Sequence, residues 1–234
     1  MKWVTIGHAL SLGLLLLSPT PAHAVPYSLS ASGTISFNTS SDATIPVGTP
    51  WSFELVYDTA APDLDFQLTG SADPTFGRFD NSGAVPALTF FHYRAGSYEV
   101  TIDDPAEFGV GSNIDITFTG VHAIDINLNA PDLFPPLAGG PVSFHADFND
   151  FSSRPIFTSD ALPTDPALGP DSFDQLSVTL LPLSGVITGS NLTSFTVSAI
   201  PEPSTAALAI LGLLSPLVAV SPARARRARG ASGG

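Results

Sequence analysis

The strongest constraint on the fold is a period-two alternation of apolar and polar residues that recurs through residues 25–200. In 27–37 every second residue is apolar or glycine, and serine or threonine fills the positions between them. In 51–58 tryptophan, phenylalanine, leucine and tyrosine alternate with serine, glutamate, valine and aspartate. Because successive side chains of a β-strand point to opposite faces, this pattern predicts half-buried antiparallel strands.

Several later segments have the same alternation and extend the prediction to about eight to ten short strands. The glycine-containing Arg94-Ala95-Gly96 connects two of them and favours a hairpin. Nowhere in 25–200 do about ten residues show helical apolar spacing without proline or glycine. The sequence therefore predicts an all-β class and a single antiparallel β-sandwich, jelly-roll-like in type. The later strands are expected at 88–93, 97–102, 114–119, 124–129, 142–148, 176–180 and 192–197.

Composition excludes several classes of protein. The 234 residues include no cysteine, which excludes disulfide scaffolds, cysteine-ligated zinc, iron–sulfur clusters and thiol nucleophiles. The formal net charge is −13 with only 8 Lys and Arg, which argues against a nucleic-acid partner because phosphate contacts come mainly from basic side chains.

The first 24 residues have the pattern of a secretory signal peptide. Lys2 precedes an apolar run at 4–17, and Ala22-His23-Ala24 supplies the small residues of a cleavage site. We expect signal peptidase to cut before Val25. A membrane anchor that stays attached is the alternative, although the apolar run is shorter than the roughly 20 residues that a spanning helix needs.

The C-terminal segment contains a second apolar run with charged and proline-rich flanks. Pro201-Glu202-Pro203 precedes an apolar stretch at 206–220, which ends before a basic cluster. As a helix at about 1.5 Å per residue, 204–220 reaches about 25 Å, enough to cross a thin bilayer. Basic residues stay on the cytoplasmic side, so everything before them is expected across the inner membrane. The cluster consists of Arg224, Arg226, Arg227 and Arg229.

This order of motif, apolar helix and arginine cluster resembles the PEP-CTERM sorting signal of exported proteins in Gram-negative bacteria that make extracellular polysaccharide. The resemblance covers 201–229 and leaves 230–234 as a tail. It implies that Pro201, Glu202 and Pro203 are recognised by an exosortase, which cuts nearby and removes the helix. It also implies that the protein is anchored in the membrane before processing and lies at the cell surface or outside the cell afterwards. An ordinary single-pass anchor that is never cut is the alternative.

The domain at 25–200 is expected to be a non-enzymatic structural or interaction protein of the exopolysaccharide or biofilm layer. It contains neither a G-x-S-x-G elbow nor an H-E-x-x-H helix. A polysaccharide-binding module, calcium-dependent or not, is the main alternative, with Phe91, Tyr93 and Tyr98 as stacking residues. A glycan hydrolase is a weaker alternative, because 20 acidic residues offer carboxylate pairs by chance; of the 21 in the chain, Glu202 alone lies outside 25–200.

The sequence predicts no cofactor, although it offers candidate ligands for a metal ion. Calcium prefers carboxylate oxygens, and the candidates for it are Asp103, Asp104, Asp147 and Asp150. His145 and Asp147 are two residues apart, so they share one face of a strand, where a residue on the neighbouring strand can complete a metal site. The alternative for all of these groups is that they are solvated polar residues without a ligand.

Overall fold

The computed structural model describes residues 25–40, 42–65, 75–117, 121–137, 140–152, 156–183 and 185–201. The predicted signal peptide (1–24), the tail (230–234) and all of the sorting segment except Pro201 lie outside the described residues. The described chain is all-β, as predicted. Its strands are β1 (Pro26–Asn38), β2 (Pro50–Asp58), β3 (Phe76–Asp80), β4 (Leu88–Ala95), β5 (Tyr98–Ile102), β6 (Asn113–Thr117), β7 (His122–Leu128), β8 (Val142–Asp150), β9 (Gln175–Pro182) and β10 (Ile187–Ala199), with 3-10 turns η1 (Pro105–Glu107) and η2 (Pro170–Ser172).

All ten strands belong to one antiparallel sheet with the order β3-β6-β7-β8-β9-β10-β1-β2-β4-β5. The predicted antiparallel pairing is therefore confirmed. The arrangement differs from the predicted sandwich, because the strands form one continuous curled sheet in place of two separate ones. We call β3-β6-β7-β8-β9 the first half-sheet and β10-β1-β2-β4-β5 the second half-sheet.

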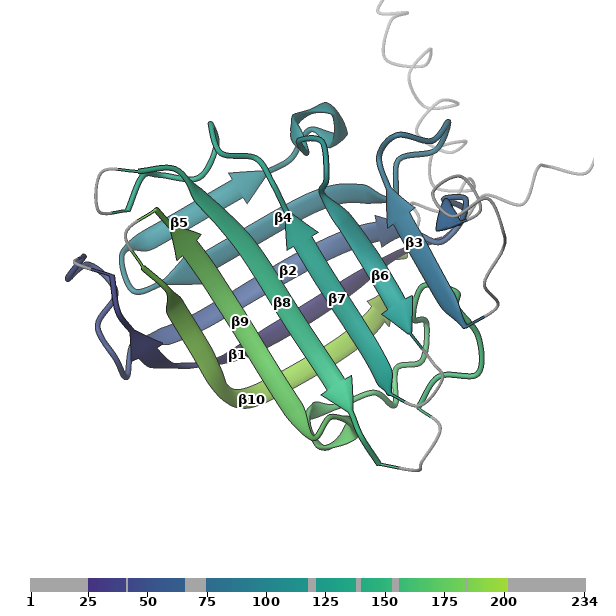
Figure 1. Cartoon of the computed structure of the whole chain (residues 1–234). Helices are drawn as coiled ribbons and strands as arrows, with labels where there is room; N and C mark the ends of the chain where they lie inside the picture. The colour runs from purple at the N-terminus through teal and green to yellow at the C-terminus, as the bar shows by residue number, and fades with distance from the viewer. Residues whose placement is uncertain are drawn as a thin grey trace, which may run out of the picture. The chain divides into compact units, whose positions relative to one another are not determined.

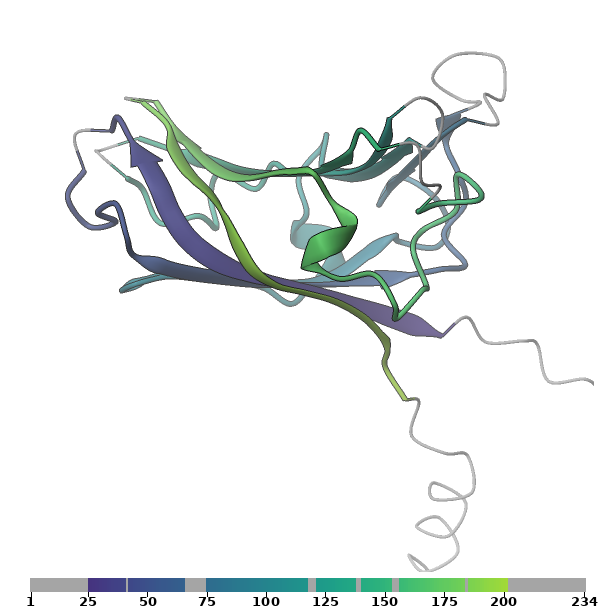
Figure 2. The ribbon, with the colours of Figure 1, turned by 90° about the horizontal axis from the view of Figure 1, so that it is seen from below.

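The sheet curls so that the two half-sheets face each other with their strands crossing (Figures 1 and 2). The curl centres on β10, which pairs with β9 only over Ile187–Gly189 but with β1 along most of its length. Pairing between β1 and β10 shifts register at three places, between Ser32 and Phe37. Because such bulges bend a strand and increase its twist, they turn the second half-sheet away from the plane of the first.

A close contact at this bend requires glycine. A Cβ atom on Gly189 would lie 2.1 Å from Nε1 of Trp51, and one on Gly33 would lie 2.7 Å from the same indole ring. The ring of Trp51 is buried, with 2% of the residue exposed. Two glycines on neighbouring strands thus leave room for the largest side chain of the core.

The core fills the space between the half-sheets, and aromatic rings join them. Phe144 of β8 lies 5.4 Å from Phe53 of β2, 4.8 Å from Phe91 and 5.4 Å from Tyr93, both of β4, between ring centroids. Each of these pairs has an edge-to-face geometry, which is favourable for aromatic rings. The alternating apolar residues of the sequence are therefore the inward-facing ones.

The proline-rich loop 161–170 contributes to the core. Leu162 and Leu168 are buried, and the hydroxyl of Tyr57 donates a hydrogen bond to the carbonyl of Pro163. Burial also raises the pKa of Tyr57, so this hydroxyl stays a donor. The loop therefore belongs to the fold and does not mark a domain boundary.

The two ends of the described domain are neighbours. Tyr27 at the start of β1 pairs with Ala199 at the end of β10. The backbone N–H of Ile200 donates to the carbonyl of Pro26 at 2.8 Å. The first and last strands of the fold thus close against each other beside both termini of the domain (Figure 2).

Candidate functional site

The strand register places a row of polar side chains across the outer face of the first half-sheet. Successive pairings align Arg78 on β3, Asp115 on β6, Asp125 on β7, Asp147 on β8 and Ser177 on β9. These residues lie two apart from polar neighbours on their own strands, so they share the face opposite the core. We call them the carboxylate row.

Arg78 and Asp115 form a two-bond ion pair at one end of the row. Nε of Arg78 donates to Oδ1 of Asp115 at 2.7 Å, and Nη2 donates to Oδ2 at 2.6 Å. The hydrogen bonds that Arg78 donates to Asp115 are the main reason why the pKa of Arg78 is raised. Since this bidentate pair uses both oxygens of Asp115, the charge of Arg78 is committed to one of the three carboxylates.

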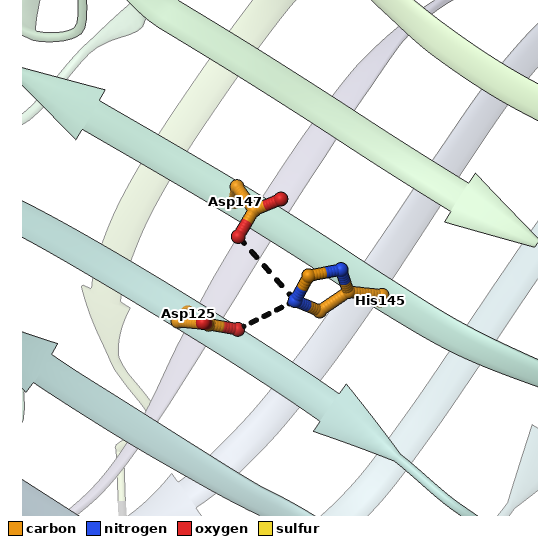
Figure 3. Close-up of side chains that lie close together, drawn as sticks. All are labelled: Asp125, His145 and Asp147. Carbon is orange, nitrogen blue, oxygen red and sulfur yellow. Dashed lines mark hydrogen bonds and ion pairs between the residues drawn. The ribbon is translucent and has the colours of Figure 1, made fainter.

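The other two carboxylates converge on a histidine (Figure 3). Nε2 of His145 lies 2.8 Å from Oδ1 of Asp125 and 3.3 Å from Oδ1 of Asp147. His145 and Asp147 come from β8, whereas Asp125 comes from β7. Among the described residues, these three form the group whose ligand atoms are close enough together to hold a metal ion.

Neighbouring side chains hold the two carboxylates in place. Nδ2 of Asn127 donates to Oδ1 of Asp125 at 3.1 Å, and Oγ of Ser177 donates to Oδ2 of Asp147 at 3.0 Å. The hydrogen bond to Asp125 is the largest cause of the raised pKa of His145, whereas burial alone would lower this pKa. The side chains of Asp125, His145 and Asp147 are 38%, 30% and 29% exposed, so the site opens to solvent. Such an arrangement can bind a proton or a metal cation.

The sequence located part of this site. His145 and Asp147 do share an outer strand face, as predicted. The third member, Asp125, was not predicted as a partner because only the register of β7 against β8 brings it there. The signal for it in the sequence was its place in a polar position of a predicted strand.

The four calcium candidates are not brought together. Asp104 caps η1 by accepting a hydrogen bond from the N–H of Ala106 at 2.9 Å, and Asp103 lies beside it in the same loop. Asp150 is fully buried on the core side of β8, whereas Asp147 faces outward, because an odd separation on a strand reverses the face. The four candidates therefore do not form one group, and calcium binding at any of them stays a prediction.

The predicted stacking aromatics are core residues. Phe91, Tyr93 and Tyr98 are 0%, 1% and 4% exposed. They belong to the inward face of the β4–β5 hairpin, and the hydroxyl of Tyr98 donates to the carbonyl of Pro135 at 3.1 Å. The prediction that they stack on a sugar is wrong for this conformation, because sugar stacking needs an exposed ring face.

The outer face of the second half-sheet has a different character. Hydroxyls from β1 and β10 bond to one another across the strands: Ser32 lies 2.7 Å from Ser194, and Ser190 lies 2.7 Å from Ser36, between Oγ atoms. We call this surface the hydroxyl face. Its further outward residues are Ser30, Ser52, Thr196 and Ser198.

A hollow of about 430 Å³ adjoins the hydroxyl face. It is lined by Ser32, Pro50, Trp51, Ser52, Arg94 and Gly96. Among these described lining residues, Arg94 is the one with a charged side chain.

The sorting motif is represented in the structure by Pro201 alone, which is exposed. In the part of the chain that the structure describes, no helix has the length and apolar character needed to span a membrane. Comparison of the chain with protein-family models, with curated proteins and with solved structures gives no match.

Proposed function

We propose that this chain is an exported, non-enzymatic protein of a Gram-negative cell surface or extracellular matrix, whose mature domain is residues 25–200. The observation that carries the proposal is the agreement of two independent boundaries. The signal-peptide pattern ends at Ala24 and the sorting motif begins at Pro201, while β1 begins at Pro26 and β10 ends at Ala199. Every described strand lies between the two proposed cleavage sites.

The neighbouring ends of the domain support a membrane-anchored intermediate. A hydrogen bond joins Ile200 to Pro26, so the leader and the tail would leave the domain from adjacent points. Both proposed cleavage sites, before Val25 for signal peptidase and near Pro201 for an exosortase, would then face the membrane together. In this scheme two cuts release a domain that contains every strand described here.

The charge of the proposed mature domain suits a soluble extracellular protein. Its basic residues are Arg78, Arg94 and Arg154, whereas all acidic residues except Glu202 remain. The domain is therefore more negative than the −13 of the whole chain. Such a charge keeps a protein dispersed through self-repulsion and repels anionic polymers, so contacts with a matrix would run through neutral groups or cations.

Intact-mass measurement on protein recovered from the producing cell tests the export proposal. We expect a chain that starts at Val25 and lacks the arginine cluster at 224–229. Surface protein that retains this cluster would overturn processing of the tail, and protein that retains residues 1–24 would overturn cleavage of the leader. Glu202→Ala offers a matched test, because it changes the sorting motif alone and should leave the tail attached.

Polysaccharide binding is a second candidate function, and the hydroxyl face favours it. This surface offers many neutral donors and acceptors for sugar hydroxyls, and the hollow beside Trp51 adjoins it. Mature protein can be passed over the producing cell's own exopolysaccharide, with calcium and with chelator. Retention would support binding, absence of retention in both conditions would leave the structural role, and released sugar would indicate a glycan hydrolase.

A further inference from the structure

We propose that Asp125, His145 and Asp147 bind one divalent first-row transition-metal ion, with Zn²⁺ as the best probe, on the outer face of the first half-sheet. The inference is independent of export and processing, because all three ligands belong to β7 and β8 of the folded domain. It also differs from the calcium candidates of the sequence, among which Asp147 was grouped with Asp150 near the end of the same strand.

The donor atoms of the three side chains converge on one point of the surface. Nε2 of His145 lies 2.8 and 3.3 Å from the nearest oxygens of Asp125 and Asp147, and all three ligand atoms lie within 4.8 Å of one another. With metal–ligand distances of roughly 2.0–2.2 Å, ligands of one ion are about 2.9–3.5 Å apart in octahedral or tetrahedral geometry. A small adjustment of side chains therefore admits an ion without movement of the strands.

Two facing carboxylates repel each other and share His145 as their nearest basic group. Asp125 and Asp147 are direct cross-strand partners, and Asp115 is the partner of Asp125 on its other side. Like charges directly opposite each other destabilise a sheet. The one arginine of the row, Arg78, is committed to Asp115 by two hydrogen bonds. A cation bound between Asp125 and Asp147 would offset the repulsion between these two carboxylates, with which Arg78 makes no hydrogen bond.

Neighbouring side chains orient the two carboxylate ligands. Ser177 holds Oδ2 of Asp147, which leaves Oδ1 directed at His145, and Asn127 holds the carboxylate of Asp125. Outer contacts of this kind fix the ligands of metal sites in proteins. The positions of the two carboxylates are thus set before an ion arrives.

The ligand types select the class of metal. An imidazole nitrogen with two carboxylate oxygens suits zinc and its first-row neighbours, whereas calcium takes six to eight oxygen ligands. Three protein ligands leave coordination positions open, and about a third of each side chain is exposed to solvent. The remaining positions would therefore carry water or an oxygen atom of an external ligand.

Isothermal titration of Zn²⁺ into the chelator-treated full chain, kept in mild detergent and free of any histidine tag, tests the site. We expect one equivalent to bind, and His145→Gln and Asp147→Asn each to weaken binding at least tenfold. His92→Gln is the matched control. His92 also contacts a carboxylate, Glu99, at 2.9 Å and is similarly exposed, but it has one acidic partner in place of two.

Two readouts separate loss of the site from loss of the fold. Far-ultraviolet circular dichroism must be the same for wild type and the variants, and Asp125→Asn serves as a second ligand variant if Asp147→Asn unfolds. Co²⁺ should give visible absorption bands that His145→Gln abolishes and His92→Gln keeps. Absence of Zn²⁺ binding, binding unchanged by His145→Gln, or equal loss in His92→Gln would each overturn the proposal.

Discussion

The outer faces of the two half-sheets are built from the same kind of strand but carry opposite surface chemistry. Across the first half-sheet, three carboxylates stand in one row with a single arginine. Across the second, neutral hydroxyls predominate, and its three acids have separate partners. Glu54 accepts from Ser28 at 2.8 Å, Glu99 contacts His92 at 2.9 Å, and Asp58 accepts from the N–H of Ala60 at 2.8 Å. One face therefore aligns its carboxylates as direct cross-strand partners, whereas the other keeps its acids apart.

The difference shows that the acidity of this chain is organised and not evenly spread. Alternation alone demands a polar residue at each outward position and is satisfied equally by serine or aspartate. Carboxylates in adjacent register are the less stable choice, because they repel. The first half-sheet keeps them beside a histidine, which suits binding of a cation, and the second presents groups that suit neutral polar ligands.

The comparison assumes that the half-sheets form one cooperative unit, and Phe144→Ala tests this assumption with the largest expected effect. Phe144 joins the half-sheets through three aromatic contacts. Its loss should cost about 3–5 kcal/mol of unfolding free energy. In urea, fluorescence and circular dichroism should shift together to a lower midpoint. Separate transitions by the two probes would mean that the half-sheets unfold independently.

The second-largest effect is expected from metal binding, which should stabilise the protein through the first half-sheet and not through the second. At a free Zn²⁺ concentration about 100 times its dissociation constant, the folded chain should gain about 2.7 kcal/mol. Thermal unfolding with Zn²⁺ and with chelator measures the gain. His145→Gln should abolish it, while His92→Gln on the second half-sheet should keep it. A gain that survives His145→Gln would place the ion elsewhere.

Removal of one arginine from each face compares their electrostatics. Arg78→Met leaves Asp115, whose side chain is 11% exposed, without its partner and should cost about 1–3 kcal/mol. Arg94 is exposed and donates to the carbonyl of Gly96, so Arg94→Met should change stability by less than about 0.5 kcal/mol. Urea midpoints measured in parallel give both values. Equal losses would show that the carboxylate row is no more strained than the opposite face.

The smallest effect on stability is expected on the hydroxyl face. Ser194→Ala removes an exposed hydroxyl that lies 2.7 Å from Ser32 and should cost less than about 0.5 kcal/mol. If this face binds polysaccharide, the same variant should reduce retention on the exopolysaccharide while its melting temperature stays near that of wild type. Unchanged retention in Ser194→Ala and Thr196→Ala together would remove the hydroxyl face as the binding surface.

Alternation in the sequence predicted nine of the strands because it records which side chains face the core. The strand it missed, β3, reads Phe-Gly-Arg-Phe-Asp, and Gly77 occupies one of its inward positions. A Cβ there would lie 2.2 Å from the carbonyl oxygen of Asp160, so the position excludes the apolar side chain that would have marked the strand. A strand position that another backbone segment approaches this closely must be glycine, so the sequence shows no hydrophobic residue there.

The continuous sheet and the complete site could not be predicted from the sequence, for a related reason. Both depend on which strands are neighbours, and alternation has the same form in a sandwich and in one curled sheet. His145 and Asp147 were recognisable because they share a strand, whereas Asp125 joins them through the register of β7 and β8. Likewise, the alternation places Tyr93 on one face of β4, but it does not tell which face of β4 the opposite half-sheet covers.

The pairing of β1 with β10 at the ends of the domain also sets how the protein would respond to mechanical load. The two strands are antiparallel, and the free ends of both lie beside the hydrogen bond from Ile200 to Pro26. A pull applied between Val25 and Pro201 acts along the hydrogen bonds of this ladder, which run perpendicular to the strands. The bonds would break one after another from that end, so the domain would unfold at low force when it is stretched between its two termini. A domain attached through one terminus alone would not experience this load.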